Sequence, residues 1–270
     1  MSVASYEKIG YLTADGVALI ELNDPPANTY SYEMMQEIDA AVLAARMDDS
    51  VHVIVLTGAG EKFFCAGANI GMLKAATPVF KYYFCLHANE TLNRLEQTTK
   101  LVIAGLNGHT VGGGLEVALA ADIRVARRDG GRIGVPEVAL GVLPGTGGTQ
   151  RLARLVGKAR AIELMVTGAL LTFDQAREIG LVNQVWSEAD LSGRPFRDAL
   201  LEYARQFTPP HKASKAVGHI KRAVQSGLEM SFADGLALER ELQQRLFESD
   251  DAREGLTANV EKRKPKFAGR

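Results

Sequence analysis

Two glutamates beside glycine-rich backbone are the side chains in this sequence best suited to chemistry. Glu116 follows three consecutive glycines in NGHTVGGGLEVALAAD (107–122), and Glu137 follows Pro136 in GVPEVALGVLPGTGGTQRL (134–152). Two carboxyl groups that share one water can act as acid and base, because one accepts a proton while the other delivers one. Each also has an ordinary alternative: Glu116 would complement a helix dipole, and Glu137 would be a surface charge.

The glycines before Glu116 predict a backbone donor at the start of a helix. First-turn N–H groups have no partner within a helix, and the helix dipole stabilises negative charge there, so Gly113 could donate to an oxygen that becomes anionic. A second stretch of small residues, FFCAGANIGML (63–73), could place the N–H of Ala68 beside it. Together the two donors would form an oxyanion hole, whereas alone the second stretch would be a tight connection.

Signatures of several other enzyme classes are missing from the sequence. GTGGTQ lacks the last glycine of the dinucleotide-binding pattern, and no Walker A loop or G-x-S-x-G nucleophile elbow occurs. The histidines form no metal-ligand pattern, so we expect no metal; His109 could touch substrate or be a hydrogen-bonded loop residue. Cys65 and Cys85 are too few for a disulfide framework and are predicted to be reduced thiols.

The elements around these stretches alternate between strands and helices. Short β-branched runs at 17–22 and 51–57 flank a helical pattern, which predicts a βαβ unit. A second helical pattern at 78–97 precedes a strand at 101–106. GGGLEVALAADIRVA (112–126) then fits a glycine turn, a short helix and a strand into one short segment. This rhythm predicts an α/β fold built as a spiral of ββα units rather than an open Rossmann sheet.

Bulk composition limits the function classes. Lysine plus arginine (31) nearly balance aspartate plus glutamate (32), giving a net charge of −1 and no support for nucleic-acid binding. No apolar stretch approaches the about 18 residues of a membrane helix, and MSVASYEKIGYL lacks the pattern of a secretory or transit peptide, so we expect a cytoplasmic protein. After Pro209 and Pro210 the chain is predicted to be a helical appendage, with an apolar stripe on helix 233–249.

In their order and spacing these stretches resemble the crotonase (enoyl-CoA hydratase/isomerase) superfamily over residues 17–186. VIVLTGAGEKFFCAGANI (53–70) is similar to the family's first oxyanion segment and NGHTVGGGLEVALAADIRVA (107–126) to its second. GVPEVALGVLPGTGGTQRLARLVG (134–157) is similar to the segment that carries its second glutamate. The resemblance implies a crotonase-like spiral core in residues 1–205. A C-terminal helical region, 206–270, would mediate trimerisation and cover the CoA site.

The resemblance also implies a reaction. It assigns the oxyanion hole to the backbone N–H groups of Ala68 and Gly113, the water-activating base to Glu116 and the proton donor to Glu137. The implied enzyme is an enoyl-CoA hydratase of fatty acid metabolism, a hydro-lyase that adds water across the 2,3 double bond of a trans-2-enoyl-CoA to give a 3-hydroxyacyl-CoA. CoA is part of the substrate, and no separate cofactor is implied. Substrate contacts are implied for Ala27, Ala66, Ala68, Asn69, Ile70, Gly112 and Gly113.

Three features depart from the family pattern. Asn69 stands where many members have aspartate, so chemistry that relies on that carboxylate is not implied. The spacing between the glutamates is about one residue longer than usual, with the extra residue placed in the loop ARRDGGR (126–132), where an insertion costs little. PPANTYSYEMM (25–35) puts Tyr30 and Tyr32 where apolar residues are expected, which indicates unusual acyl specificity.

Other functions remain open from the sequence. Within the same fold, one glutamate could shuttle a proton in an enoyl-CoA isomerase or in a lyase for a specialised acyl-CoA. A non-catalytic acyl-CoA-binding or RNA-binding relative is disfavoured by the charge balance and by the presence of both glutamates. The resemblance implies a homotrimer or a dimer of trimers. The basic tail EKRKPKFAGR (261–270) resembles a segment that approaches the adenine end of CoA, and otherwise would be solvated.

Overall fold

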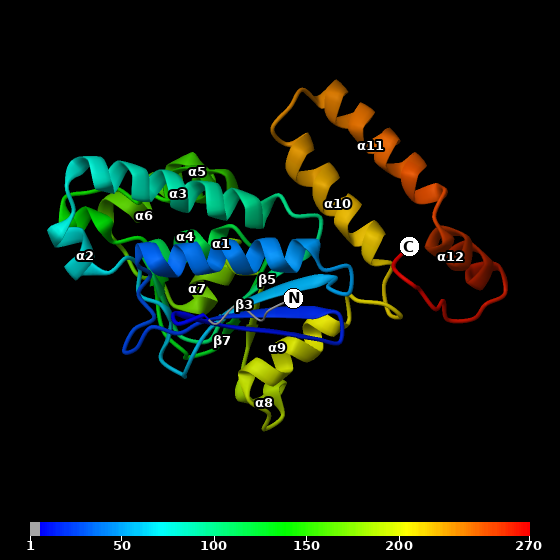
Figure 1. The fold of residues 1–270 in the computed structure, drawn as a ribbon, viewed down its shortest axis with the longest axis horizontal. Helices are drawn as coiled ribbons and strands as arrows, with labels where there is room; N and C mark the ends of the chain where they lie inside the picture. The colour runs from blue at the N-terminus through cyan, green and yellow to red at the C-terminus, as the bar shows by residue number, and fades with distance from the viewer. Residues whose placement is uncertain (1–5) are drawn as a thin grey trace.

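A six-stranded sheet forms the centre of the computed structural model, which describes residues 6–270 (Figure 1). The strand order is β1-β2-β3-β5-β7-β9; β1 and β2 form an antiparallel hairpin, and the remaining neighbours are parallel. The strands are β1 (Ile9–Ala14), β2 (Val17–Leu22), β3 (Val53–Gly58), β5 (Leu101–Leu106), β7 (Ile123–Arg127) and β9 (Gln184–Trp186).

A smaller parallel sheet is built from the segments that follow the central strands. Its strands are β4 (Phe63–Cys65), β6 (His109–Val111) and β8 (Ile133–Gly134), in that order. Each comes directly after a strand of the large sheet, so the chain passes from β3 to β4, from β5 to β6 and from β7 to β8. Helices follow these pairs, and the predicted α/β spiral of ββα units is confirmed.

Both faces of the large sheet are covered, and its central strands β3 and β5 are buried along their whole length. Successive residues of a strand point to opposite faces. In β3, Ile54 belongs to the core shared with α1 (Tyr32–Met47) and α3 (Pro78–Glu96), and Val55 belongs to the core shared with α9 (Phe196–Arg205). In Figure 1, α1 and α3 lie above the sheet and α9 below it.

Local capping signals explain where the long helices begin. Ser31 accepts a hydrogen bond from the N–H of Met34 at the start of α1, and Thr77 does the same for Phe80 at the start of α3, where Pro78 is the first helical residue. The other helices of the core are α2 (Ile70–Ala75), α4 (Gly113–Leu119), the 3₁₀ helix η1 (Glu137–Leu140), α5 (Gly148–Val156), α6 (Lys158–Thr167), α7 (Phe173–Glu178) and α8 (Glu188–Leu191).

The last part of the chain forms a helical hairpin that extends from the body (Figure 1). It consists of α10 (Ser214–Gly227) and α11 (Phe232–Phe247), followed by α12 (Asp250–Val260). The sequence boundary predicted between residues 205 and 206 lies at the end of α9. Lys221 of α10 anchors the hairpin, because its buried ammonium lies 2.9 Å from the Asp122 carboxylate. The hairpin also exposes apolar side chains: Ile220, Val224, Leu228, Phe232 and Leu236.

The basic C-terminal segment 261–270 keeps its charged side chains exposed, while its backbone is held by the rest of the protein. The Asp251 carboxylate accepts hydrogen bonds from the backbone N–H groups of Ala268 and Gly269, and the N–H of Phe267 donates to the Pro210 carbonyl. The segment therefore folds back onto α12 and the start of the hairpin, away from α2 at the other end of the molecule (Figure 1).

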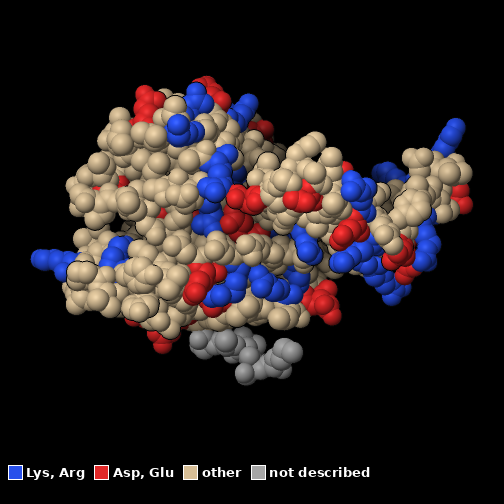
Figure 2. Space-filling view, turned by 90° about the horizontal axis from the view of Figure 1, so that it is seen from above, with Lys and Arg blue, Asp and Glu red and all other residues tan. Residues whose placement is uncertain are grey.

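Charges are mixed over the face shown in Figure 2, where basic side chains alternate with acidic ones. None of the helices within residues 6–270 combines the length and the apolar composition that a bilayer crossing requires.

Candidate active site

Glu116 is buried in the first turn of α4 and is held by the loop that precedes α5. Only 2% of the residue is exposed. Its Oε1 accepts hydrogen bonds from the backbone N–H groups of Thr146 and Gly148, both at 2.7 Å, and its Oε2 accepts one from the Thr146 hydroxyl. A side chain at position 148 would prevent this contact, because a Cβ there would lie 2.9 Å from Oε1. Three donors around one carboxylate fix its orientation.

Glu137 is the first residue of η1 and lies over the glycines that begin α4. A Cβ at Gly112 would lie 2.7 Å from Glu137 Oε1, and Gly112 has a φ of +58°, so glycine is required there on two grounds. Burial, with a smaller contribution from the negative charge of Glu116, raises the pKa of Glu137 to about 7. Its Oε2 is buried and has no hydrogen-bond partner among residues 6–270.

The two glycine-rich stretches lie side by side, as the oxyanion-hole hypothesis requires. A Cβ at Gly67 would lie 3.3 Å from the nitrogen of Gly113 and 3.1 Å from the carbonyl oxygen of Val111. Gly67 has a φ of +93°, a conformation that favours glycine. Within the described part of the chain, the N–H groups of Ala68 and Gly113 donate to no backbone or side-chain acceptor. Both remain available to a ligand.

Tyr30 packs against the backbone of the site, a role that the sequence did not predict. The residue is 2% exposed, and its ring is stacked on Phe84 with the ring centroids 5.8 Å apart. A Cβ at Gly113 would lie 2.2 Å from the Tyr30 hydroxyl oxygen, which also lies 3.2 Å from Thr146 Oγ1. The tyrosine thus connects the predicted oxyanion loop to the loop that holds Glu116.

The other predicted substrate-binding residues lie on the same loop system. The carbonyl of Ala27 accepts the N–H of Ala66 at 3.1 Å, which ties the N-terminal loop to the oxyanion segment. Asn69 is the N-cap of α2, and its Oδ1 accepts the N–H of Met72 at 2.9 Å. This capping bond accounts for Asn69 without a catalytic role. Ile70, next in the chain, is 58% exposed.

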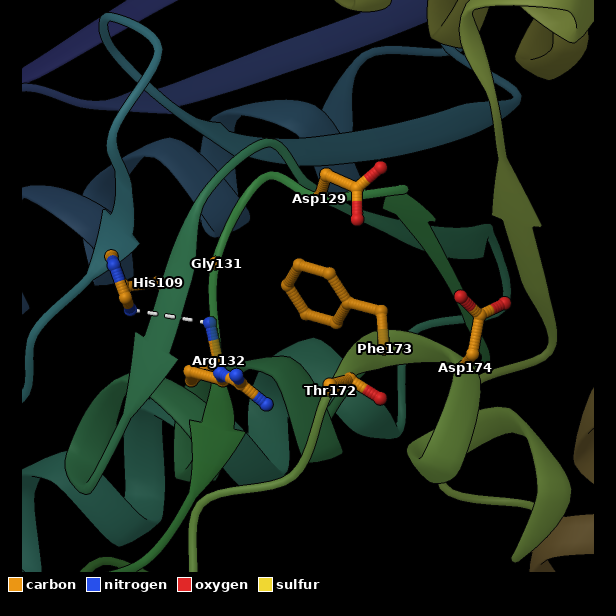
Figure 3. Close-up of a pocket in the computed structure, with 7 residues that line it drawn as sticks. All are labelled: His109, Asp129, Gly131, Arg132, Thr172, Phe173 and Asp174. Carbon is orange, nitrogen blue, oxygen red and sulfur yellow. Dashed lines mark hydrogen bonds between the residues drawn. The ribbon is translucent and has the colours of Figure 1, made fainter.

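His109 belongs to a separate pocket to which neither glutamate contributes (Figure 3). Its Nδ1 accepts a hydrogen bond from the backbone N–H of Arg132 at 3.2 Å. His109 therefore fits the second of its two predicted roles, a hydrogen-bonded residue, although it lies on strand β6 rather than in a loop. The pocket is lined by His109, Asp129, Gly131, Arg132, Thr172, Phe173 and Asp174.

Comparison with known families decides the classification. The model of the family described as "Enoyl-CoA hydratase/isomerase" matches residues 13–270. The chain belongs to the enoyl-CoA hydratase/isomerase family. The match confirms the resemblance inferred from the three motifs and extends it beyond Trp186 to the C-terminal helices, whose sequence had carried no recognised motif.

Relatives in the enoyl-CoA hydratase/isomerase family cover nearly the whole chain. The short-chain-enoyl-CoA hydratase of Clostridium acetobutylicum is 38% identical over 92% of both chains. The crotonyl-CoA hydratase of Syntrophomonas wolfei is 34% identical, covering 97% of this chain and 98% of its own. A crystal structure of an enoyl-CoA hydratase from Geobacillus kaustophilus is 44% identical with a TM-score of 0.93, covering 99% of this chain and 98% of that one.

Proposed function

We propose that the protein is an enoyl-CoA hydratase that adds water to the 2,3 double bond of a trans-2-enoyl-CoA thioester and forms a 3-hydroxyacyl-CoA. The observation that carries this proposal is the pair of unlike carboxyl groups. Both oxygens of Glu116 accept hydrogen bonds from fixed donors, whereas Glu137 has a pKa raised to about 7 by burial. Paired groups whose environments separate their protonation states suit acid and base roles.

Glu116 is the base in this proposal. Its carboxylate removes a proton from water as the water oxygen attacks the β-carbon. The N–H groups of Thr146 and Gly148 and the Thr146 hydroxyl together hold the carboxylate in one orientation. A fixed orientation lowers the barrier because no reorganisation is needed during the reaction.

Glu137 is the proton donor, and the backbone stabilises the charge between the two steps. Attack at the β-carbon moves negative charge onto the thioester oxygen, which the N–H groups of Ala68 and Gly113 would bind. Glu137 then delivers its proton to the α-carbon. Because its pKa is about 7, a large share of Glu137 carries a proton near neutral pH, as an acid must.

CoA enters as part of the substrate, bound along the loop system of Ala27, Ala66, Asn69 and Ile70, and no separate cofactor takes part. Relatives are named for short-chain-enoyl-CoA, crotonyl-CoA and 2,3-dehydroadipyl-CoA. These names support an enoyl thioester as the substrate class, and crotonyl-CoA as the first compound to test.

Assembly into a homotrimer, or a dimer of trimers, is part of the proposal. The apolar side chains that the α10–α11 hairpin exposes support it, because a patch of this kind on an extended element is typical of a subunit interface. Sedimentation of the purified protein tests the assembly.

The proposed cytoplasmic location is tested by fractionation of expressing cells.

The function is tested by following the absorbance of the conjugated enoyl thioester with crotonyl-CoA. Glu116→Gln and Glu137→Gln should each lower kcat by about 10³-fold or more, since acid–base groups contribute about 10²–10⁴-fold. The matched control is Glu163→Gln, which changes an exposed glutamate of α6 and should retain wild-type activity. A wild type that is silent on enoyl-CoAs of several lengths, yet shifts the double bond of a 3-enoyl-CoA, would make the protein an isomerase instead.

A further inference from the structure

Thr146 contacts Glu116 through both its main chain and its side chain. Its N–H donates to Oε1 at 2.7 Å, and its hydroxyl donates to Oε2 at 2.5 Å. Thr146 is 1% exposed, so the hydroxyl has no access to bulk water as an alternative partner. Arg151 links this loop to α3, because its guanidinium donates to the Thr146 carbonyl at 3.5 Å and lies 2.8 Å from the Glu96 carboxylate.

The hydroxyls of Thr146 and Tyr30 form a chain with a defined direction. An ionised carboxylate has no hydrogen, so Thr146 must donate its only hydroxyl hydrogen to Glu116. Its oxygen is then left as an acceptor for Tyr30, which lies 3.2 Å away. Burial raises the pKa of Tyr30 well above its usual value, and the nearby negative charge of Glu116 adds to this, so the tyrosine keeps its proton and remains a donor.

Counting acceptor sites shows where a water can bind Glu116. A carboxylate offers about four lone-pair sites, two on each oxygen. Oε1 is fully used by the N–H groups of Thr146 and Gly148, and Oε2 has a single partner, the Thr146 hydroxyl. One acceptor site remains, on Oε2, next to the bond made by Thr146.

We propose that Thr146 and Tyr30 are positioning residues that hold Glu116 with a single free acceptor site on Oε2, aimed at the attacking water. This inference rests on the proposed role of Glu116 as the base. Loss of the Thr146 hydroxyl lets the carboxylate rotate and leaves two free sites on Oε2 instead of one, so the water loses its defined place. Tyr30 acts one step further away, because it keeps the Thr146 hydrogen directed at Glu116.

Packing makes the chain of hydroxyls rigid. Tyr30 is fixed by its stack on Phe84 and by its contact with Gly113, where a Cβ would lie 2.2 Å from the tyrosine oxygen. The same tyrosine therefore touches the predicted oxyanion donor and, through Thr146, the base. One fixed side chain therefore helps to position both the Gly113 N–H and the Glu116 carboxylate. The reaction needs this, because the attacking water and the thioester oxygen must be held at a defined distance from each other.

The test compares Thr146→Val, which keeps the shape of the side chain without the hydroxyl, with Thr146→Ser, which keeps the hydroxyl. We expect Thr146→Val to lower kcat by about 10- to 100-fold, the range for one hydrogen bond to a charged group. KM should stay within about twofold, because substrate binding is not touched. Thr146→Ser should regain most of the activity. Thr149→Val, in the first turn of α5, is the control, because the Thr149 hydroxyl accepts a hydrogen bond from Gln150 and makes none to Glu116.

Tyr30→Phe completes the test as a double-mutant cycle. Alone it should lower kcat by about two- to tenfold, the range for one neutral hydrogen bond. In the Thr146→Val background it should have no further effect, because the hydroxyl it directs is gone. Circular dichroism and thermal unfolding confirm that each variant folds.

Several results would overturn the inference: equal losses in Thr146→Ser and Thr146→Val, a rise in KM at constant kcat, or fully additive effects of the two substitutions. A crystal structure of Thr146→Val gives a readout that does not depend on activity. An unchanged Glu116 carboxylate in that structure would refute the positioning role even if the wild type hydrates no enoyl-CoA. An inactive wild type with a rotated carboxylate in the variant would instead refute the proposed function and keep the positioning role.

Discussion

The raised pKa of Glu137 predicts a pH dependence that links stability to activity. Burial holds the folded-state pKa at about 7, against 4.5 as the ordinary value. Between these two pH values the folded protein keeps a proton that the unfolded chain releases, so stability falls as pH rises. The contribution is fully present below about 4.5 and is lost once the pH passes about 7. Glu137→Gln, which has no charge to bury, should lack this loss.

The size of the effect follows from the shift. Moving a pKa from 4.5 to about 7 corresponds to at most about 3 kcal/mol. Because the side chain is only partly buried, solvent screening reduces the expected value to about 1–2 kcal/mol. Urea unfolding at pH 5 and pH 8 measures the effect. The free energy of unfolding of Glu137→Gln minus that of the wild type should be about 1–2 kcal/mol larger at pH 8 than at pH 5.

Activity gives the second half of the same prediction. If Glu137 is the proton donor, kcat/KM of the wild type falls as pH rises through about 7. The residual activity of Glu137→Gln should show no such fall. Glu163→Gln, with its exposed carboxyl, should follow the wild type in both measurements. A wild type whose stability and kcat/KM are both flat between pH 6 and pH 8 would refute the reasoning.

Three further predictions concern the backbone at Gly112, the ion pair of Lys221 and the helix cap at Asn69. Gly112→Ala should lower kcat by about 100-fold or more, because the new Cβ displaces Glu137, and stopped-flow hydration assays measure it; wild-type kcat would contradict the contact. Lys221→Met should cost about 3–5 kcal/mol in urea unfolding by leaving Asp122 buried and unpaired, and a loss below about 1 kcal/mol would show that the pair is not desolvated. Asn69→Asp should be nearly neutral in thermal unfolding, whereas Asn69→Ala should lose about 1 kcal/mol, and equal losses would argue against capping.

The regular part of the fold was accessible from the sequence because its signals are local. The run 101–106 is strand β5 as predicted, and the helix predicted at 78–97 is α3, with its capping threonine and initial proline. The strand predicted at 51–57 begins two residues later, at Val53. The strands of the small sheet were missed because each has only two or three residues, too few for a period to be recognised.

The site was accessible only in part, for a different reason. Glu116 and Glu137 could be predicted because each lies beside a glycine-rich stretch and because these stretches follow one another in a recognisable order. The hydrogen bonds that hold Glu116 join residues 30 or 32 positions apart in the sequence, and they depend on how two segments meet in space. The sequence did show Tyr30 as a departure from the family pattern, but only packing reveals that its hydroxyl reaches Thr146. The threonine in PGTGG was the one local signal, and it was not recognised.

The glycines around the site change what a mutational scan can detect. At Gly67, Gly112, Gly113 and Gly148 the space that a methyl group would need is taken by a backbone atom, by the carboxyl group of Glu116 or Glu137, or by a tyrosine. An alanine scan is normally a subtraction experiment, in which the lost side chain is the information. At these four glycines alanine instead adds a methyl group. Such substitutions therefore report directly on the spacing between the backbone, the two glutamates and Tyr30.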